Sequence, residues 1–254
     1  MLYNQNPYIA LIIIGNEILS GRTLDKNTQY VATKLGSIGV ELKEVRVIPD
    51  VEAEIVNTVN HLREKYDYVV TTGGIGPTHD DITSAAVAKA FGVELYRHPE
   101  AYKVLAEHYK GEENFNSGRL KMTYVPQGAE LIGNPISMAP GFKMENVFVL
   151  AGVPSIMQAM LENVIPQLRH GVPVRAKTVN VKTGESVIAT EMTELQKKYK
   201  HIDIGSYPYT NDPDHADGKH GTNIVFRGQD VGAIDNAIGE FVGLLKKMKI
   251  DFVR

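Results

Sequence analysis

The chain has 254 residues, a length that suits one large domain or two small ones. Hydrophobic residues make up 43% and charged residues 22%, values near the globular average that indicate neither a disordered nor a fibrous chain. The formal net charge of −3 provides no basic excess for a phosphate backbone, so we expect no nucleic-acid partner. With no cysteine, disulfides, thiol catalysis and cysteine-bound zinc are excluded.

The N-terminal apolar run Ile9–Ile14 is too short to cross a bilayer or to serve as a signal sequence. It predicts a buried strand. We therefore expect no membrane partner, and the lack of cysteine suits a reducing, cytoplasmic location.

The first 170 residues alternate between strand-like and helix-like segments. Continuous apolar runs predict strands that are buried on both faces, and the alternation of apolar and charged residues over Glu41–Ile48 predicts a further strand. In chain order the predicted strands are Ile9–Ile14, Glu41–Ile48, Tyr68–Thr72 and Val147–Leu150, and the helices are Asn27–Leu35, Glu52–Lys65, Thr83–Phe91 and Ser155–Leu168. This order predicts an α/β domain over residues 1–171, with a mostly parallel sheet and helices on both faces.

The pattern changes after Gly171. The following segments predict a strand, a helix, two strands and a closing helix, at Val174–Lys182, Glu185–Tyr199, Ile202–Tyr207, Thr222–Arg227 and Asp230–Lys247. This order indicates a small α+β domain of the split βαβ type over residues 172–254.

A polar loop, Asn211–His220, separates the two strands of that second domain. Its acids suggest an EF-hand, but Ala216 fills the fifth position and Asn223 stands where a glutamate is required. We predict a solvated hairpin loop.

The central feature is a glycine-rich acidic loop, Thr71–Thr83, between a predicted strand and a predicted helix. In open α/β sheets, ligands collect beyond the carboxyl ends of the strands. Gly73, Gly74 and Gly76 let the backbone approach a ligand, and the N–H groups there and at the helix start favour a phosphate or carboxylate. The spacing fits neither a Walker A loop nor a dinucleotide-binding fingerprint.

Two carboxylates, Asp80 and Asp81, follow the glycines. They would repel a bound phosphate unless a divalent cation such as Mg²⁺, Mn²⁺ or Co²⁺ lay between them, so we expect a metal site here. The alternative is that one aspartate caps the helix that begins at Thr83.

Short motifs in the same order along the chain resemble those of one family. The loop reads Gly-Gly-x-Gly-Pro-Thr-x-Asp-Asp-x-Thr, which looks like the signature of the molybdopterin-binding (MoCF) domain, a MogA-like fold, in its CinA-type form. Further similar motifs are Ile14–Gly21 with Asp25 and Asn27, Val47–Asp50, Asn134-Pro135, Ala139–Phe142, Ala151–Ser155 and, in the second domain, Gly205–Pro208. Together they cover nearly the whole chain.

The resemblance implies a nucleotide or pterin pocket at the strand ends. Gly73, Gly74 and Gly76 would hold the phosphate. Asp50 and Asp81 match acidic positions of molybdopterin adenylyltransferases, and Glu17 lies in the first motif as a third catalytic candidate. The other implied binding residues are Gly15, Asn16, Asp25, Asn27, Thr72, Pro77, Thr78, Asn134, Pro135, Ala139, Pro140 and Gly141.

Several of these residues also have a purely structural interpretation. Asn16 and Glu17 could satisfy the turn after the first strand. Asp50 could cap the next helix. The Asn134–Gly141 segment is ordinary loop chemistry when taken alone. Ile156 departs from the family pattern, because the resemblance implies a glutamate there.

The resemblance favours a metal-dependent pyrophosphatase that hydrolyses a dinucleotide-type diphosphate such as ADP-ribose or FAD. The alternatives are a molybdopterin adenylyltransferase-like enzyme and a non-catalytic pterin- or nucleotide-binding module, which Ile156 favours. The resemblance also implies a homodimer. The deamidase domain of longer CinA-type proteins has no counterpart in these 254 residues.

Overall fold

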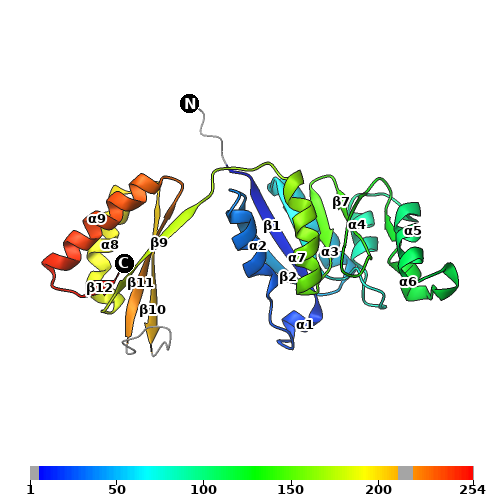
Figure 1. The fold of residues 1–254 in the computed structure, drawn as a ribbon, viewed down its shortest axis with the longest axis horizontal. Helices are drawn as coiled ribbons and strands as arrows, with labels where there is room; N and C mark the ends of the chain where they lie inside the picture. Colours follow the sequence, from blue (N-terminus) through cyan, green and yellow to red (C-terminus); the bar gives the residue numbers. More distant parts are fainter. Residues whose placement is uncertain (1–5, 211–219, 254) are drawn as a thin grey trace. The chain divides into compact units, whose positions relative to one another are not determined.

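A computed structural model of the chain describes residues 6–210 and 220–253. The chain divides into two compact units, Met1–Gly171 and Val172–Arg254, which are described separately (Figure 1). Most of the hairpin loop predicted at Asn211–His220 lies outside the described residues. No described helix is long and apolar enough to cross a membrane.

The first unit is built on a six-stranded sheet in the order β2-β1-β3-β8-β7-β6. The first four strands in this order are parallel, and the last two run antiparallel to their neighbours. Their bounds are β1 Tyr8–Ile14, β2 Glu41–Ile48, β3 Tyr68–Thr72, β8 Val147–Leu150, β7 Gly141–Met144 and β6 Glu130–Ile132.

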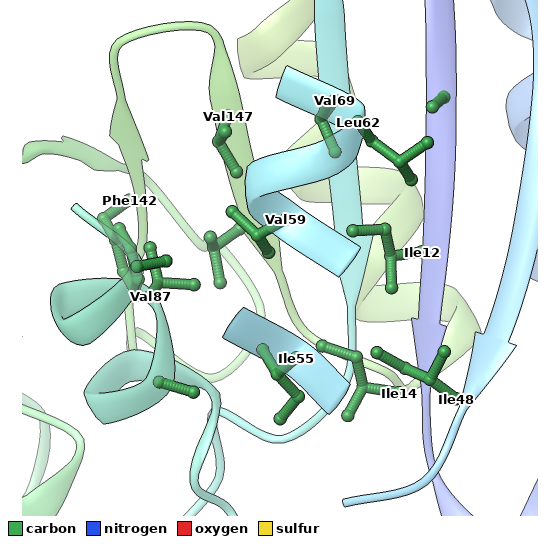
Figure 2. Packing of buried hydrophobic residues seen from close by; sticks show 14 of the residues in the cluster. Ile12, Ile14, Ile48, Ile55, Val59, Leu62, Val69, Val87, Phe142 and Val147 are labelled. Atoms are coloured by element: carbon green, nitrogen blue, oxygen red, sulfur yellow. The ribbon is translucent and has the colours of Figure 1, made fainter. Parts of the chain in front are cut away.

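Helices cover both faces of this sheet, because successive side chains of a strand point to opposite sides. One face of β1 presents Ile12 and Ile14 to α3 (Glu52–Lys65) and α4 (Thr83–Ala90), as Figure 2 shows for the α3 side chains. Its other face packs beneath α2 (Asn27–Gly36) and α7 (Pro154–Val164). The predicted α/β class is therefore confirmed.

Several elements of the first unit have no counterpart in the sequence prediction. Between α4 and β6 the chain forms a two-stranded antiparallel sheet and two helices, and α1 follows β1. The bounds are α1 Asn16–Leu19, β4 Leu95–Arg97, α5 Pro99–His108, η1 Glu112–Asn114, α6 Ser117–Lys121 and β5 Tyr124–Pro126. The helix predicted over Ser155–Leu168 instead ends at Val164 and continues as η2 (Ile165–Gln167), because Pro166 cannot donate a helical hydrogen bond.

The edge strand β2 contains a bulge. Ile9 pairs with Leu42 and Ala10 pairs with Glu44, so Lys43 is an extra residue on the β2 side. Beyond the bulge, the Glu44 carboxylate accepts hydrogen bonds from the Lys65 ammonium at 2.8 Å and the Tyr66 hydroxyl at 2.7 Å. These bonds, with one from Arg46, lower the pKa of Glu44 to about 2 and tie β2 to the end of α3.

The second unit has a four-stranded antiparallel sheet in the order β10-β11-β9-β12, with two helices. The bounds are β9 Arg175–Val181, α8 Glu185–Lys198, β10 Asp203–Thr210, β11 His220–Gly228, α9 Val231–Lys247 and β12 Phe252–Val253. Phe226 and Phe241 meet in its core with ring centroids 5.6 Å apart. Asp230 caps α9 by accepting from the Ala233 N–H at 3.0 Å. The split βαβ order matches the prediction and is completed by β12, which is too short to predict.

Candidate functional site

A pocket of about 470 Å³ lies where the parallel strands of the first unit end. Each parallel strand contributes the segment that follows it, as expected for an open α/β sheet. The described residues that line the pocket are Ile14, Glu17, Asp50, Gly73, Gly74, Ile75, Gly76, Pro77, Thr78, Asp80, Asp81, Tyr109, Met122, Asn134, Ser137, Ala139, Ala151, Gly152, Val153 and Ile156.

The acidic loop, residues 73–81, has a backbone that requires glycine. Gly73 and Gly74 have φ angles of 108° and 70°, which disfavour side chains. A Cβ on Gly73 would lie 2.2 Å from the Ile14 carbonyl oxygen, so the loop crosses directly against the end of β1. Thr83 fixes this shape, because its hydroxyl donates to the Gly73 carbonyl at 3.0 Å and its N–H to the Gly74 carbonyl at 2.9 Å.

The backbone donors of the loop differ from the prediction at one glycine. The Gly73 N–H donates to the Leu150 carbonyl at 3.1 Å and belongs to the sheet, so it cannot hold a phosphate. The N–H groups of Gly74, Ile75 and Gly76 have no partner among residues 6–210 and 220–253. The donors of the loop that remain available to a ligand are therefore these three N–H groups.

Thr78 organises the two aspartates of the acidic loop. Asp81 Oδ2 accepts the Thr78 N–H at 2.8 Å, and the Thr78 hydroxyl lies within hydrogen-bonding distance of both Asp80 and Asp81. The hydroxyl is the main cause that lowers the pKa of Asp80 below its ordinary value. The alternative reading of an aspartate as a helix cap is wrong, because α4 starts after Ile82 without any side-chain cap.

Two further carboxylates reach the pocket from the first two strands. Asp50 Oδ2 accepts the Asn16 N–H at 2.9 Å, which holds the end of β2 against the end of β1. Its reading as a helix cap is wrong, since α3 starts after Val51 without a side-chain cap. Within the described part of the chain, no hydrogen bond to the Glu17 carboxylate is formed.

The apolar loop, residues 151–156, follows β8 and starts α7. It lies beside the acidic loop, because a Cβ on Gly152 would approach Gly73 Cα to 3.2 Å. The Asn27 carboxamide donates to the Gly152 carbonyl at 2.9 Å and fixes this loop from α2. The side chain of Ile156 lines the pocket at the position where the resemblance implies a glutamate.

Asn134, which is 5% exposed, shapes the third wall. Its amide donates to the Ser137 hydroxyl at 2.7 Å and the Ala139 carbonyl at 2.8 Å. Its carbonyl oxygen accepts the N–H groups of Ile136 and Ser137. Because the Asn134 carboxamide forms its hydrogen bonds within its own loop, we infer that the residue fixes the shape of this wall.

The structure places eight predicted binding residues outside the pocket lining: Gly15, Asn16, Asp25, Asn27, Thr72, Pro135, Pro140 and Gly141. Asp25 accepts the N–H groups of Asn27 and Thr28 at 2.8 and 3.2 Å and so starts α2. A Cβ on Gly141 would lie 2.2 Å from the Val149 carbonyl oxygen, so glycine is needed here for β7 to pack closely against β8. Asp25 and Gly141 thus support the surrounding elements and do not line the pocket.

Tyr109 and Met122 line the pocket although the sequence analysis did not identify them. They flank η1 and α6, in the segment for which no elements were predicted. Ser137 was also missed, although its neighbours Asn134 and Ala139 belong to quoted motifs. No local motif marks Tyr109 as a pocket residue.

No group of three or more His, Asp or Glu side chains among the described residues forms a ready metal site. The residues present nevertheless fit a hard divalent cation. Magnesium is commonly held by one or two carboxylates together with waters and substrate phosphates. Asp81 offers Oδ1, which accepts no hydrogen bond within the described residues, and the Asp80 carboxylate is exposed beside it.

The fold and the pocket define an α/β domain with a glycine-rich, acidic pocket at its strand ends, joined to a small α+β unit. Residues 10–170 match the family model described as a probable molybdopterin binding domain, and residues 173–254 match the model of the FAD synthase middle domain. Because the first match covers more than half of the chain, the protein belongs to the molybdopterin-binding domain family.

Relatives and a solved structure agree with this assignment. A protein of Archaeoglobus fulgidus is 34% identical over 236 residues, which cover 92% of this chain and 96% of that protein. One of Thermococcus kodakarensis is 34% identical over 245 residues, or 91% and 94% of the two chains. The crystal structure of CinA from Thermoplasma acidophilum, described as of unknown function, is 32% identical, with a TM-score of 0.61, and covers 65% of this chain and 99% of its own. The CinA-type resemblance is confirmed.

Proposed function

We propose that the pocket hydrolyses the diphosphate bond of a nucleotide such as ADP-ribose or FAD with the help of a divalent metal ion. The observation that carries the proposal is the charge of the pocket. Four carboxylates line it, those of Glu17, Asp50, Asp80 and Asp81, and none of its described lining residues is Lys, Arg or His.

This charge balance favours an anionic ligand only if a cation accompanies it. A diphosphate that contacts the free N–H groups of Gly74, Ile75 and Gly76 lies beside Asp81, because a Cβ on Gly76 would already be 2.8 Å from Asp81 Oδ2. At such distances like charges repel strongly. A divalent ion held by Asp80 and Asp81 would neutralise the negative charges of these carboxylates and of the diphosphate, and it would polarise the phosphate.

The remaining groups suit attack by water. The three backbone donors would hold phosphate oxygens and stabilise the charge that develops on them. Asp50 is fixed by the Asn16 N–H, whereas the Glu17 carboxylate accepts no hydrogen bond from the described residues. We assign Glu17 or Asp50 to orient and deprotonate the water.

The test is a hydrolysis screen of purified protein with ADP-ribose, FAD and NAD against Mg²⁺, Mn²⁺ and Co²⁺. We expect AMP to be released from ADP-ribose only when a metal is added. A folded protein that releases no AMP with any of the three metals contradicts the proposal.

A non-catalytic binding module is the rival that a specific observation favours. Ile156 places an apolar side chain in the pocket where a glutamate is implied, and a missing carboxylate could leave the water unactivated. This rival predicts saturable binding of ADP-ribose without turnover, which calorimetry together with the hydrolysis screen would reveal.

Adenylyl transfer to a pterin is the second rival, and the match to a probable molybdopterin binding domain favours it. It predicts release of pyrophosphate from ATP that depends on an added molybdopterin. The homodimer implied by the resemblance remains a prediction, which light scattering of the purified chain would check.

A further inference from the structure

Tyr109 is the one aromatic side chain among the described residues that line the pocket. It comes from the segment of α5, η1 and α6, which lies at the far end of the first unit from α2 and β2 in Figure 1. Met122, just after α6, lines the same pocket. These two side chains add apolar surface to the pocket from a segment other than the apolar loop.

The backbone fixes Tyr109 at the end of a helix. It is the C-cap residue of α5, with its N–H donating to the Leu105 carbonyl at 2.9 Å. Lys110 and Gly111 then take left-handed φ angles of 63° and 133°, and the Gly111 N–H returns to the Ala106 carbonyl at 2.9 Å. This helix-ending turn sets the direction of the tyrosine side chain.

The ring of Tyr109 is also supported by its neighbours. The Arg119 guanidinium carbon lies 4.0 Å from the ring centroid, and the Phe115 ring meets it edge-on at 6.2 Å. Arg119 is itself held by the Asn114 carbonyl at 2.6 Å. None of the ion pairs formed within the described residues involves Arg119. The ring is therefore held in place before any ligand arrives.

The same segment is attached to the acidic loop. The Lys121 ammonium donates to the Thr78 carbonyl, and a Cβ on Gly118 would come within 2.7 Å of the Pro77 carbonyl oxygen. The close approach at Gly118 and the bond from Lys121 hold α6 against the loop that binds the phosphate in our proposal. Tyr109 therefore keeps a fixed position relative to that loop.

We propose that Tyr109, with Arg119 against its ring and Met122 in the same pocket lining, is the subsite for a planar nitrogen heterocycle attached to the phosphate of the ligand. An aromatic ring held in advance stacks on such a heterocycle without being ordered on binding. Arg119 adds positive charge next to the Tyr109 ring, whereas the pocket lining itself carries four carboxylates. The inference rests on the proposed function only in placing a phosphate at the acidic loop.

The test compares the affinity of the full chain for AMP and for ribose 5-phosphate, which lacks the base, by titration calorimetry with Mg²⁺ present. The wild type should prefer AMP. Tyr109→Ala should weaken AMP binding about tenfold, within the range found for loss of one base-stacking aromatic, and leave ribose 5-phosphate binding unchanged. Tyr109→Phe should keep the preference for AMP, because the ring remains.

Tyr207→Ala is the matched control, since Tyr207 lies in the second unit and is 59% exposed. If Tyr109→Ala does not fold, Tyr109→Leu replaces it, because leucine fills space without offering a ring face. A pterin monophosphate is titrated in parallel. Tighter binding than that of AMP, lost in the same variants, supports the subsite and identifies the heterocycle as a pterin.

Three results overturn the inference: equal affinity of the wild type for AMP and ribose 5-phosphate, equal weakening of both in Tyr109→Ala, or no binding of any of the three compounds. Failure of the proposed hydrolysis would look different. It would leave the Tyr109-dependent preference for AMP intact while ADP-ribose stays uncleaved.

Discussion

The acidic loop and the apolar loop occupy equivalent places in the fold but carry different chemistry. Each follows one of two adjacent parallel strands, β3 and β8, contains glycine at the point of closest approach, and starts a helix. The acidic loop presents two aspartates organised by Thr78, whereas the apolar loop presents Val153 and Ile156. The backbone thus provides two similar glycine-containing turns, and their side chains make only the acidic loop a candidate metal site.

The sheet determines where the two loops lie, and the loop side chains determine the charge of the pocket. The position at the strand ends follows from the topology, and the glycines follow from the crowding between neighbouring strands. The charge does not follow from either. Changes to the two loops should therefore have unequal and separable effects.

The largest effect is expected from Asp81→Asn, which keeps the side-chain shape and removes the charge. If Asp81 holds the metal, metal-dependent release of AMP from ADP-ribose should fall about 1000-fold, as for loss of a group that stabilises the transition state. Steady-state kinetics measure the effect. Asp235→Asn, which removes a surface partner of Lys177, is the control and should change little. Equal activity of wild type and Asp81→Asn would show that the charge of Asp81 is not needed for the metal-dependent reaction.

Gly73→Ala should cost more stability than Gly152→Ala. At Gly73 a Cβ meets the Ile14 carbonyl oxygen at 2.2 Å with φ at 108°, whereas at Gly152 the nearest atom is 3.2 Å away. We expect losses of about 3 and below about 1 kcal/mol in the free energy of unfolding, respectively. Urea denaturation followed by circular dichroism measures both. Similar losses would mean that the apolar loop is as crowded as the acidic one.

Ile156→Glu gives the apolar loop the acid that the family pattern implies. A fifth carboxylate in the pocket should tighten divalent metal binding about tenfold, because ligand charge strengthens hard-cation sites. Metal titration at fixed ADP-ribose concentration provides the measurement, with Ile156→Leu as the control of equal size. Unchanged metal dependence would show that this position does not face the metal.

Thr78→Val should produce the smallest effect, a change in pH dependence. The Thr78 hydroxyl keeps the pKa of the Asp80 carboxyl below its ordinary value. Without it that pKa rises, so the charged form is lost at a higher pH during acidification. The acid limb of the kcat/KM profile should therefore move to higher pH, while Ser155→Ala in the apolar loop should leave it in place. If the acid limb does not move in Thr78→Val, the reaction does not depend on the ionisation of Asp80.

The sequence predicts the parts of the site that depend on local patterns. Gly73–Asp81 follows a strand with an apolar run and Asp50 follows a strand with an alternating pattern, and both reach the pocket. Asp25 and Asn27 belong to a recognisable motif but serve to start α2 and to fix Gly152. A motif match cannot distinguish a residue that touches the ligand from one that supports the wall.

Tyr109 could not be predicted, because its place depends on contacts between distant segments. The bond from Lys121 to the Thr78 carbonyl and the close approach at Gly118 bring α6 to a loop about 40 residues earlier in the chain. Short strands such as β4 and β12 were missed for a related reason, since two or three residues show no clear periodicity.

The bulge at Lys43 has a consequence for how this protein behaves at high concentration. An open sheet offers unpaired backbone groups at both ends, and these can recruit strands from other molecules into aggregates. Here β6 is three residues long, and β2 combines the irregular pairing at Lys43 with the charges of Glu44 and Arg46. Both edge strands of this six-stranded sheet are therefore poor templates for strand addition. We therefore expect that self-association of the first unit uses side-chain surfaces and does not extend its sheet.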